Sequence, residues 1–179
     1  MVDTKNIASV IHLEKADLTL MDIEAIVFYA QHNLILGSGF GNAIAVRGGS
    51  SIQEELKTYG TISTGEAVIT SAGELKSNYI IHAVGPRFRE SDIEEKLIAT
   101  MQSVLKIVEE NKIREIGFPP MGTGFYGIPL ALSARVMFEV IKKHLAGKTV
   151  LEKVVICVMD QREHNAFKKV LDEKKELMG

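Results

Sequence analysis

The chain has a single cysteine and no long apolar run, and both absences limit what it can be. One cysteine cannot form an internal disulfide, and Cys157 lies inside the apolar run 154–159, so we expect it to be a buried small hydrophobe. No segment approaches the ~20 apolar residues of a transmembrane helix, and the N-terminus lacks the apolar core of a signal peptide. We therefore expect a soluble, cytoplasmic protein without a membrane partner.

The chain also carries little net charge. The 179 residues include 21 Lys and Arg and 23 Asp and Glu, which gives a formal net charge of −2. A surface that follows the phosphates of DNA or RNA needs a marked excess of basic residues. Nucleic acid is therefore not an expected partner, although a small local pocket for phosphates is compatible with this charge.

Familiar catalytic and metal motifs are missing as well. The five histidines have no metal-ligand spacing, and there is no Cys/His cluster, so we predict neither a metal nor a cofactor. No G-x-S-x-G elbow or Ser-His-Asp order is present. His82 lies in an apolar run and is expected in the core. His32 follows a predicted strand and is either a general base or a surface residue.

Strand-like and helical patterns alternate along the chain, which is typical of a sheet covered by helices. Strands are predicted over 7–13, 25–30, 68–70, 79–84, 115–118 and 154–159. Helical patterns cover 42–56 with a break near Gly48–Gly49, the stretch around 97–108, the stretch from Pro129 to Gly147, and the C-terminus. Capping boxes are predicted at Ser51 with Glu54 and at Ser91 with Glu94.

No linker, repeat or low-complexity tract interrupts this alternation. We therefore expect one domain over residues 1–179, of the α/β class with a three-layer α/β/α fold.

Two glycine-rich turns stand between a predicted strand and a helix. They are Gly37-Ser-Gly-Phe-Gly41 and the segment Phe118-Pro-Pro-Met-Gly-Thr-Gly-Phe-Tyr-Gly127. Glycine permits positive φ and close approach of the backbone, and free N–H groups at a helix start bind anions. Two such turns indicate a ligand with more than one phosphate; the alternative is that both are tight connections without a ligand. The spacing does not fit the G-x-G-x-x-G fingerprint of dinucleotide-binding oxidoreductases.

Other residues near these turns are compatible with a nucleotide. Asp17 follows the first predicted strand, and its carboxylate either accepts a hydrogen bond from an exocyclic amine such as that of adenine or caps the next turn. Phe40, Phe125 and Tyr126 stand inside the turns. They either stack on a base or ribose or hold the loops in place.

Taken together, several segments resemble a macro domain, the ADP-ribose-binding module, over nearly the whole chain. The segments, in order, are Ala16–Thr19, Ala25–Val27, Gly37–Gly41 with Ala43–Ile44, Gly65–Thr70, Tyr79–Pro86 and 118–127. The resemblance implies a mixed sheet between helices and a cleft at the strand ends. That cleft would bind ADP-ribose or a related adenine nucleotide.

The resemblance also implies roles for individual residues. Asp17 would take the adenine amino group, and the Leu18 N–H would support the same ring. The distal ribose and one phosphate would lie along Gly37, Ser38, Gly39, Phe40 and Gly41. The diphosphate would be wrapped by the backbone of Gly122, Thr123, Gly124, Phe125 and Tyr126.

The chain departs from the family pattern at the distal ribose. Members with hydrolase activity usually carry Asn-Ala-Ala-Asn after the second strand, and here the four residues are Phe28-Tyr29-Ala30-Gln31. Gln31 is one methylene longer than the asparagine, and a misplacement of about 1 Å can cost ~100-fold in rate. Ser38 replaces a glycine, and its Cβ would restrict φ. Met159 stands where some members place an aromatic residue against adenine.

Three functions follow from these observations. The leading hypothesis is binding of ADP-ribose or a related adenine nucleotide. The second is hydrolysis of ADP-ribosylated protein or of O-acetyl-ADP-ribose, with Gln31 and His32 as the catalytic residues; whether the chain is an enzyme stays open because the asparagine motif is replaced. The third is an interaction protein whose Phe28, Tyr29 and Phe40 fill the cleft. An open cleft would separate the first two from the third. The sequence does not predict an oligomeric state.

Overall fold

The computed structural model describes residues 7–178, with side chains up to residue 173. The N-terminal residues on which the signal-peptide expectation rests lie outside the described part. Within that part, no helix combines the length and the apolar character that a membrane crossing requires.

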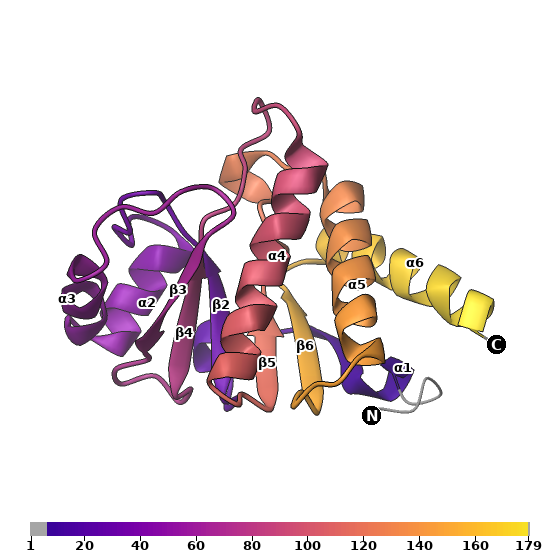
Figure 1. Cartoon of the computed structure of the whole chain (residues 1–179), viewed down its shortest axis with the longest axis horizontal. Coiled ribbons are helices and arrows are strands. Elements are labelled where there is room, and N and C mark those ends of the chain that lie inside the picture. The colour runs from indigo at the N-terminus through magenta and orange to yellow at the C-terminus, as the bar shows by residue number, and fades with distance from the viewer. Residues whose placement is uncertain (1–6, 179) are drawn as a thin grey trace.

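A six-stranded mixed sheet forms the centre of the fold, in the order β1-β6-β5-β2-β4-β3 (Figure 1). Only β3 runs antiparallel to its neighbour, β4; the other neighbouring pairs are parallel. The strands are β1 (Ile11–Lys15), β2 (Ala25–Tyr29), β3 (Ala67–Ser71), β4 (Tyr79–Ala83), β5 (Glu115–Phe118) and β6 (Lys153–Val158). This confirms the predicted mixed sheet.

Helices cover both faces of the sheet. They are α1 (Ile7–Val10), α2 (Phe40–Gly48), α3 (Ser51–Lys57), α4 (Ile93–Glu110), α5 (Leu130–Ala146) and α6 (Gln161–Met178), with short 3-10 turns η2 (Leu18–Leu20) and η3 (Gly124–Tyr126). One core joins α1, α4, α5 and α6 to one face of the sheet, and a second core joins α2 and α3 to the other. The predicted three-layer α/β/α fold is confirmed (Figure 1).

The strand predicted over 7–13 is wrong in its first half, because residues 7–10 form the single helical turn α1. Ile7 and Val10 are both buried, and residues three apart share a helical face. Short apolar runs fit a strand and a buried helical turn equally well, so periodicity could not separate the two.

Both predicted capping boxes are also wrong. The N-caps of α3 and α4 are Ser50 and Asp92, and neither side chain bonds to the first helical turn. The glutamates expected to complete the boxes have ion-pair partners instead: Glu54 with Lys57 at 2.7 Å, and Glu94 with Arg135 at 2.9 Å.

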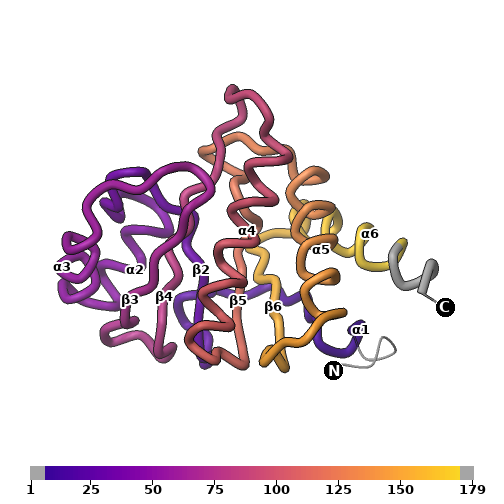
Figure 2. The backbone as a smooth tube through the Cα atoms, in the orientation of Figure 1, coloured from indigo at the N-terminus to yellow at the C-terminus, as the bar shows by residue number. Residues whose placement is uncertain are grey.

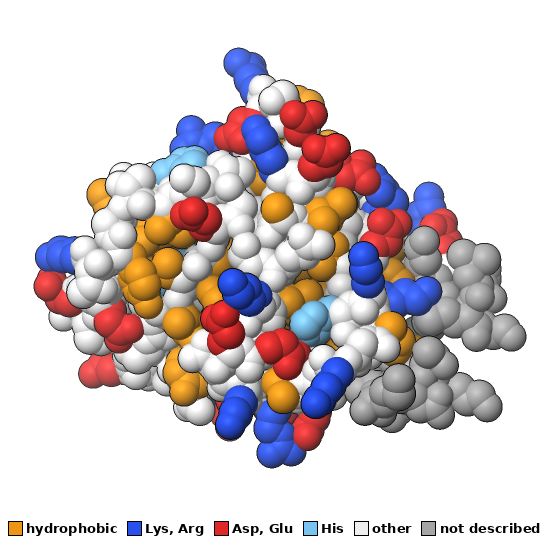
Figure 3. All heavy atoms as spheres, viewed as in Figure 1, with side chains coloured by type: hydrophobic (Ala, Val, Ile, Leu, Met, Phe, Trp, Pro, Cys, Tyr) orange, Lys and Arg blue, Asp and Glu red, His pale blue; other side chains and the backbone are white. Residues whose placement is uncertain are grey.

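The parallel strands fix where the loops lie. Because β1, β6, β5 and β2 run in the same direction, the segments that follow them meet at one edge of the sheet. Figure 2 allows the chain to be followed from β2 into the loop before α2, and from β5 into the loop before α5. On the face seen in Figure 3, acidic and basic side chains are interspersed, in line with the low net charge.

Phe167 should anchor α6 to the rest of the domain, since among the described side chains of this helix it is the large one that is almost completely buried. Phe167→Ala is expected to lower the free energy of unfolding by about 3–5 kcal/mol, because it removes apolar contacts and leaves a cavity. Urea denaturation measures this. Exposed Lys169 on the same helix provides the control, and Lys169→Ala should change stability by less than about 0.5 kcal/mol. Equal effects of the two variants would contradict this role for Phe167.

Candidate functional site

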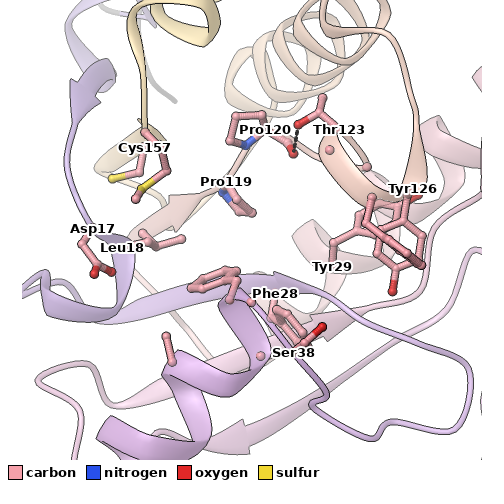
Figure 4. A pocket seen from close by; sticks show the side chains of 18 of the residues that line it. Asp17, Leu18, Phe28, Tyr29, Ser38, Pro119, Pro120, Thr123, Tyr126 and Cys157 are labelled. Atoms are coloured by element: carbon pink, nitrogen blue, oxygen red, sulfur yellow. Dashed lines mark hydrogen bonds between the residues drawn. The ribbon is translucent and has the colours of Figure 1, made fainter.

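An open cavity of about 740 Å³ lies at the carboxyl ends of the parallel strands. Its walls come from the segments after β1, β2, β5 and β6, so residues far apart in the sequence meet there (Figure 4). Of the residues predicted to bind a ligand, the lining includes Asp17, Leu18, Ser38, Gly39, Phe40, Gly41, Gly122, Thr123, Gly124, Phe125 and Tyr126. Gly37 is absent from the lining. Gln31 belongs to it, and His32 does not.

The first glycine turn leads directly into α2. Gly39 is the N-cap of this helix. Its φ is +62°, a backbone conformation that residues other than glycine rarely adopt. Ser38 is not among the residues with positive φ, so its Cβ imposes no strain. The concern that a serine here distorts the turn is therefore wrong. The N–H groups of the first turn of α2 have no acceptor within the helix, and Gly39, Phe40 and Gly41 line the cavity.

The second glycine turn faces the first across the cavity. Gly122 has φ +77°, and a Cβ at this position would lie 2.6 Å from the Ile128 side chain. The following residues form η3, and α5 begins after Pro129, which is its N-cap. The Thr123 hydroxyl donates to the Pro120 carbonyl at 3.2 Å, which fixes this side chain within its own loop.

Asp17 lies at one end of the cavity, where it caps η2. Its Oδ1 accepts hydrogen bonds from the Thr19 N–H at 2.9 Å and the Thr19 hydroxyl at 2.6 Å. Its Oδ2 pairs with Arg47 Nη1 at 2.6 Å. Burial opposes ionisation of this carboxyl, but the bonds from Thr19 and Arg47 outweigh it and hold the pKa of Asp17 below its ordinary value.

Sequence reasoning missed Arg47. Its guanidinium also donates to the Thr19 hydroxyl at 2.6 Å, so it joins α2 to the turn after β1. The available signal was helical spacing: Ala43 and Arg47 are four residues apart, so they share one face of α2, and both line the cavity.

Apart from Glu163, whose Oε1 accepts a hydrogen bond from the Met159 N–H at 2.8 Å, the rest of the lining at this end of the cavity is apolar. Leu18 and Cys157 line it, and both are buried, which confirms the expectation for the cysteine. Burial raises the pKa of the Cys157 thiol to about 12, so this group stays protonated near neutral pH. Met159 also lines the cavity and is largely exposed. These side chains form an apolar surface next to the Asp17–Arg47 ion pair, and a flat ring could pack against that surface.

Aromatic rings surround the segment that replaces the asparagine motif. Phe28 packs edge-on against Phe40, with centroids 5.4 Å apart, and Tyr29 packs against Tyr126 at 4.8 Å. The Tyr29 hydroxyl donates to the Pro86 carbonyl at 2.5 Å, and burial raises the pKa of Tyr29. These rings line the cavity and leave it open. The arrangement speaks against the interaction protein with a filled cleft.

The two candidate catalytic residues differ in position. The Gln31 amide donates to the Ile35 carbonyl at 3.3 Å while still lining the cavity. His32 Nδ1 lies 2.9 Å from the Ile62 carbonyl, and its Nε2 lies 3.4 Å from the Thr64 hydroxyl, away from the cavity lining.

Two further expectations concern histidine and metals. His82 is fully buried, as predicted, and burial lowers its pKa to about 3. In the described part of the chain, no three His, Cys, Asp or Glu side chains are grouped in a way that could hold a metal ion.

Comparison with known proteins links this geometry to one family. The model of the Macro domain family matches residues 29–137. A macro domain-containing protein of Caldanaerobacter subterraneus is 37% identical over 91% of this chain and 96% of its own length. An O-acetyl-ADP-ribose deacetylase of Pantoea vagans is 35% identical over 88% and 96%. A macrodomain of Trypanosoma brucei, solved in complex with ADP-ribose, superposes with a TM-score of 0.86 at 28% identity, over 94% of this chain and 71% of that one.

Arg47 should control the ionisation of Asp17. Arg47→Met is expected to raise the pKa of Asp17, because the variant removes a cation and a hydrogen-bond donor while keeping an unbranched side chain. Titration of the Asp17 carboxyl carbon by NMR measures the change. Arg135→Met, which breaks the separate ion pair with Glu94, is the control and should leave the Asp17 titration unchanged. An unaltered pKa in Arg47→Met would show that Thr19 alone stabilises the carboxylate.

Proposed function

Because this chain belongs to the macro domain family, we propose that its cleft binds ADP-ribose or a related adenine nucleotide. One observation carries the proposal: an open cavity of about 740 Å³ lies between two facing glycine turns and has an ionised aspartate at one end. Its volume falls within the roughly 300–1,000 Å³ typical of ligand pockets. The ADP-ribose complex of the trypanosome macrodomain supports the same ligand class for this cleft.

In this proposal the adenine ring lies between Leu18 and the apolar side chains beside Cys157. Asp17 accepts three hydrogen bonds from the protein, two on Oδ1 and one on Oδ2. A carboxylate has about four acceptor positions, so one on Oδ2 remains for the adenine amino group. The Leu18 N–H, at the start of η2, supports the same ring.

The diphosphate then lies between the two glycine turns. The N-terminus of α2 and the backbone of the second turn supply N–H donors, and the helix dipole favours negative charge at this point. Gly37 does not line the cavity, so we assign it a role in the shape of the turn and not in ligand contact. Charge neutralisation by a basic side chain is not required, which fits the low net charge of the chain.

Hydrolysis of an ADP-ribosyl bond is the second candidate. The deacetylase activity named for the Pantoea relative supports it, as does the position of Gln31 in the cavity lining. His32 supports it less, because its ring nitrogens face Ile62 and Thr64. We also propose that an ADP-ribosylated protein is a partner, and that the chain acts in the cytoplasm as one domain over residues 1–179.

Isothermal titration calorimetry with ADP-ribose, ADP and AMP tests the binding function. Asp17→Ala is expected to weaken binding of all three by about 10-fold or more, because a hydrogen bond to a charged group contributes roughly 1.5–3 kcal/mol. The exposed Asp22, near Asp17 in the sequence, provides the control, and Asp22→Ala should bind as tightly as the parent chain. Absence of binding by the parent chain at millimolar concentrations of all three ligands would remove the proposed function.

Release of ADP-ribose from an ADP-ribosylated protein tests the second candidate. We expect Gln31→Ala to slow release by about 10-fold or more through loss of substrate positioning, while His32→Ala retains the parent rate. Release that is slowed only by His32→Ala would reverse the assignment. No release above the uncatalysed background would exclude hydrolysis and leave the binding function intact.

A further inference from the structure

Arg47 has more hydrogen-bond donors than the protein uses. Its Nη1 donates to Asp17 Oδ2 and to the Thr19 hydroxyl, both at 2.6 Å. A guanidinium carries five N–H donors in a planar fork. Within the described residues, Nε and Nη2 of Arg47 make no hydrogen bond. The side chain lines the cavity and is 41% exposed, so it has donors available to a ligand.

The ion pair holds these donors next to an acceptor. Asp17 Oδ2 keeps one acceptor position beside the bond from Arg47. The Thr19 hydroxyl donates to Asp17 and accepts from Arg47, so it connects the two side chains a second time. Neither partner can turn away without losing hydrogen bonds. An available acceptor and an available donor therefore stand side by side at this end of the cavity.

Adenine presents the complementary groups along one edge. Its amino group donates, and the neighbouring ring nitrogen N7 accepts. Asn and Gln side chains recognise this edge with one acceptor and one donor of a single amide. Asp17 and Arg47 supply the same two functions from two side chains. Because both are charged, their hydrogen bonds are stronger than those of an amide.

The course of α2 favours N7 over N1, the ring nitrogen on the other side of the amino group. Gly39 and Phe40 at the start of this helix line the cavity, and Ala43 and Arg47 line it further along. The phosphates in the proposed binding mode lie at the helix start, so the nucleotide runs along α2 from phosphates to base. In the usual anti conformation of a nucleotide, N7 lies on the side of the base nearer the 5′-phosphate. The edge that contains N7 therefore faces Arg47, and N1 faces the Leu18 N–H.

We propose that Arg47 donates a hydrogen bond to N7 of the adenine base, so that the Asp17–Arg47 pair recognises the amino group and N7 together. Arg47 is then a specificity-determining residue that contacts the ligand, in addition to its pairing with Asp17. This inference rests on the proposed adenine nucleotide function, because it requires the base to occupy the Asp17 end. It goes beyond that function in naming the base atom that is recognised and the residue that recognises it.

Calorimetry with ADP and 7-deaza-ADP tests the inference. The second ligand replaces N7 with a C–H group and keeps the amino group, the sugar and the phosphates. We expect the parent chain to bind 7-deaza-ADP about 10-fold more weakly than ADP, because it loses a hydrogen bond to a charged group. This comparison needs no variant, so it does not depend on the folding of one.

Arg47→Met separates contact from positioning. This variant should bind ADP more weakly than the parent chain does, and it should bind ADP and 7-deaza-ADP equally, because methionine has no donor for N7. Combining the change in the ligand with the change in the protein isolates the interaction between N7 and Arg47. The matched control is Arg135→Met. Arg135 is also ion-paired and its side chain is also 41% exposed, but it does not line the cavity, so this variant should keep the 10-fold difference.

The resonance of N7 in ¹⁵N-labelled ADP gives a second readout. A ring nitrogen that accepts a hydrogen bond resonates further upfield than one without a donor. We expect N7 to move upfield when ADP binds the parent chain, and to move much less when ADP binds Arg47→Met. A residue that only orients Asp17 would not produce this difference.

The possible failures are distinguishable. Equal binding of ADP and 7-deaza-ADP by the parent chain would overturn the inference and leave the proposed function standing. A 10-fold difference that persists in Arg47→Met would overturn the assignment of Arg47, because another group must then contact N7. A parent chain that binds neither ligand at millimolar concentration would remove both the inference and the proposed binding of ADP.

Discussion

The parallel pairing of β2 with β5 is the constraint on which the rest of the structure depends. Its register, Ala25 with Ile116 and Ile26 with Gly117, places the ends of both strands at the same edge of the sheet. The two glycine turns follow those ends, so they face each other although about 80 residues separate them in the sequence. At Gly117 a Cβ would lie 2.6 Å from Leu18, so this glycine also lets η2 approach the sheet closely. One strand pair thus positions three walls of the cavity.

The sequence predicted best where local pattern and tertiary environment agree. Strand β5 matches its predicted bounds because a short apolar run that ends at Pro119 suits a strand covered on both faces. The end of α5 at Gly147 was equally clear. One prediction failed because a distant partner changed the outcome. The carboxylate of Glu94 pairs with Arg135 on another helix, and no local spacing reveals that competition.

Some features of the candidate site could likewise be predicted from local sequence, and others required the fold. The glycine turns are local signals, since positive φ and a position before a helix can be inferred from the sequence. The Asp17–Arg47 pair joins residues thirty positions apart and required the fold before it could be recognised. His32 shows the opposite error. Its sequence position beside Gln31 suggested the cavity, but its hydrogen bonds to Ile62 and Thr64 hold it outside the lining.

The packing shows where the side chains that replace the asparagine motif lie. Side chains alternate between the faces of a strand, so Phe28 joins the core under α2 and α3 while Tyr29 joins the core under α4 and α5. Each ring nevertheless reaches the cavity, because both lie at the end of β2 where the sheet stops. Phe28 and Tyr29 therefore contribute two rings to the cavity lining, and Tyr126 and Phe40 add to them from the glycine turns. The substitutions therefore act together. They supply aromatic surface to the cleft, while the Asp17–Arg47 ion pair and the two glycine turns line the rest of it.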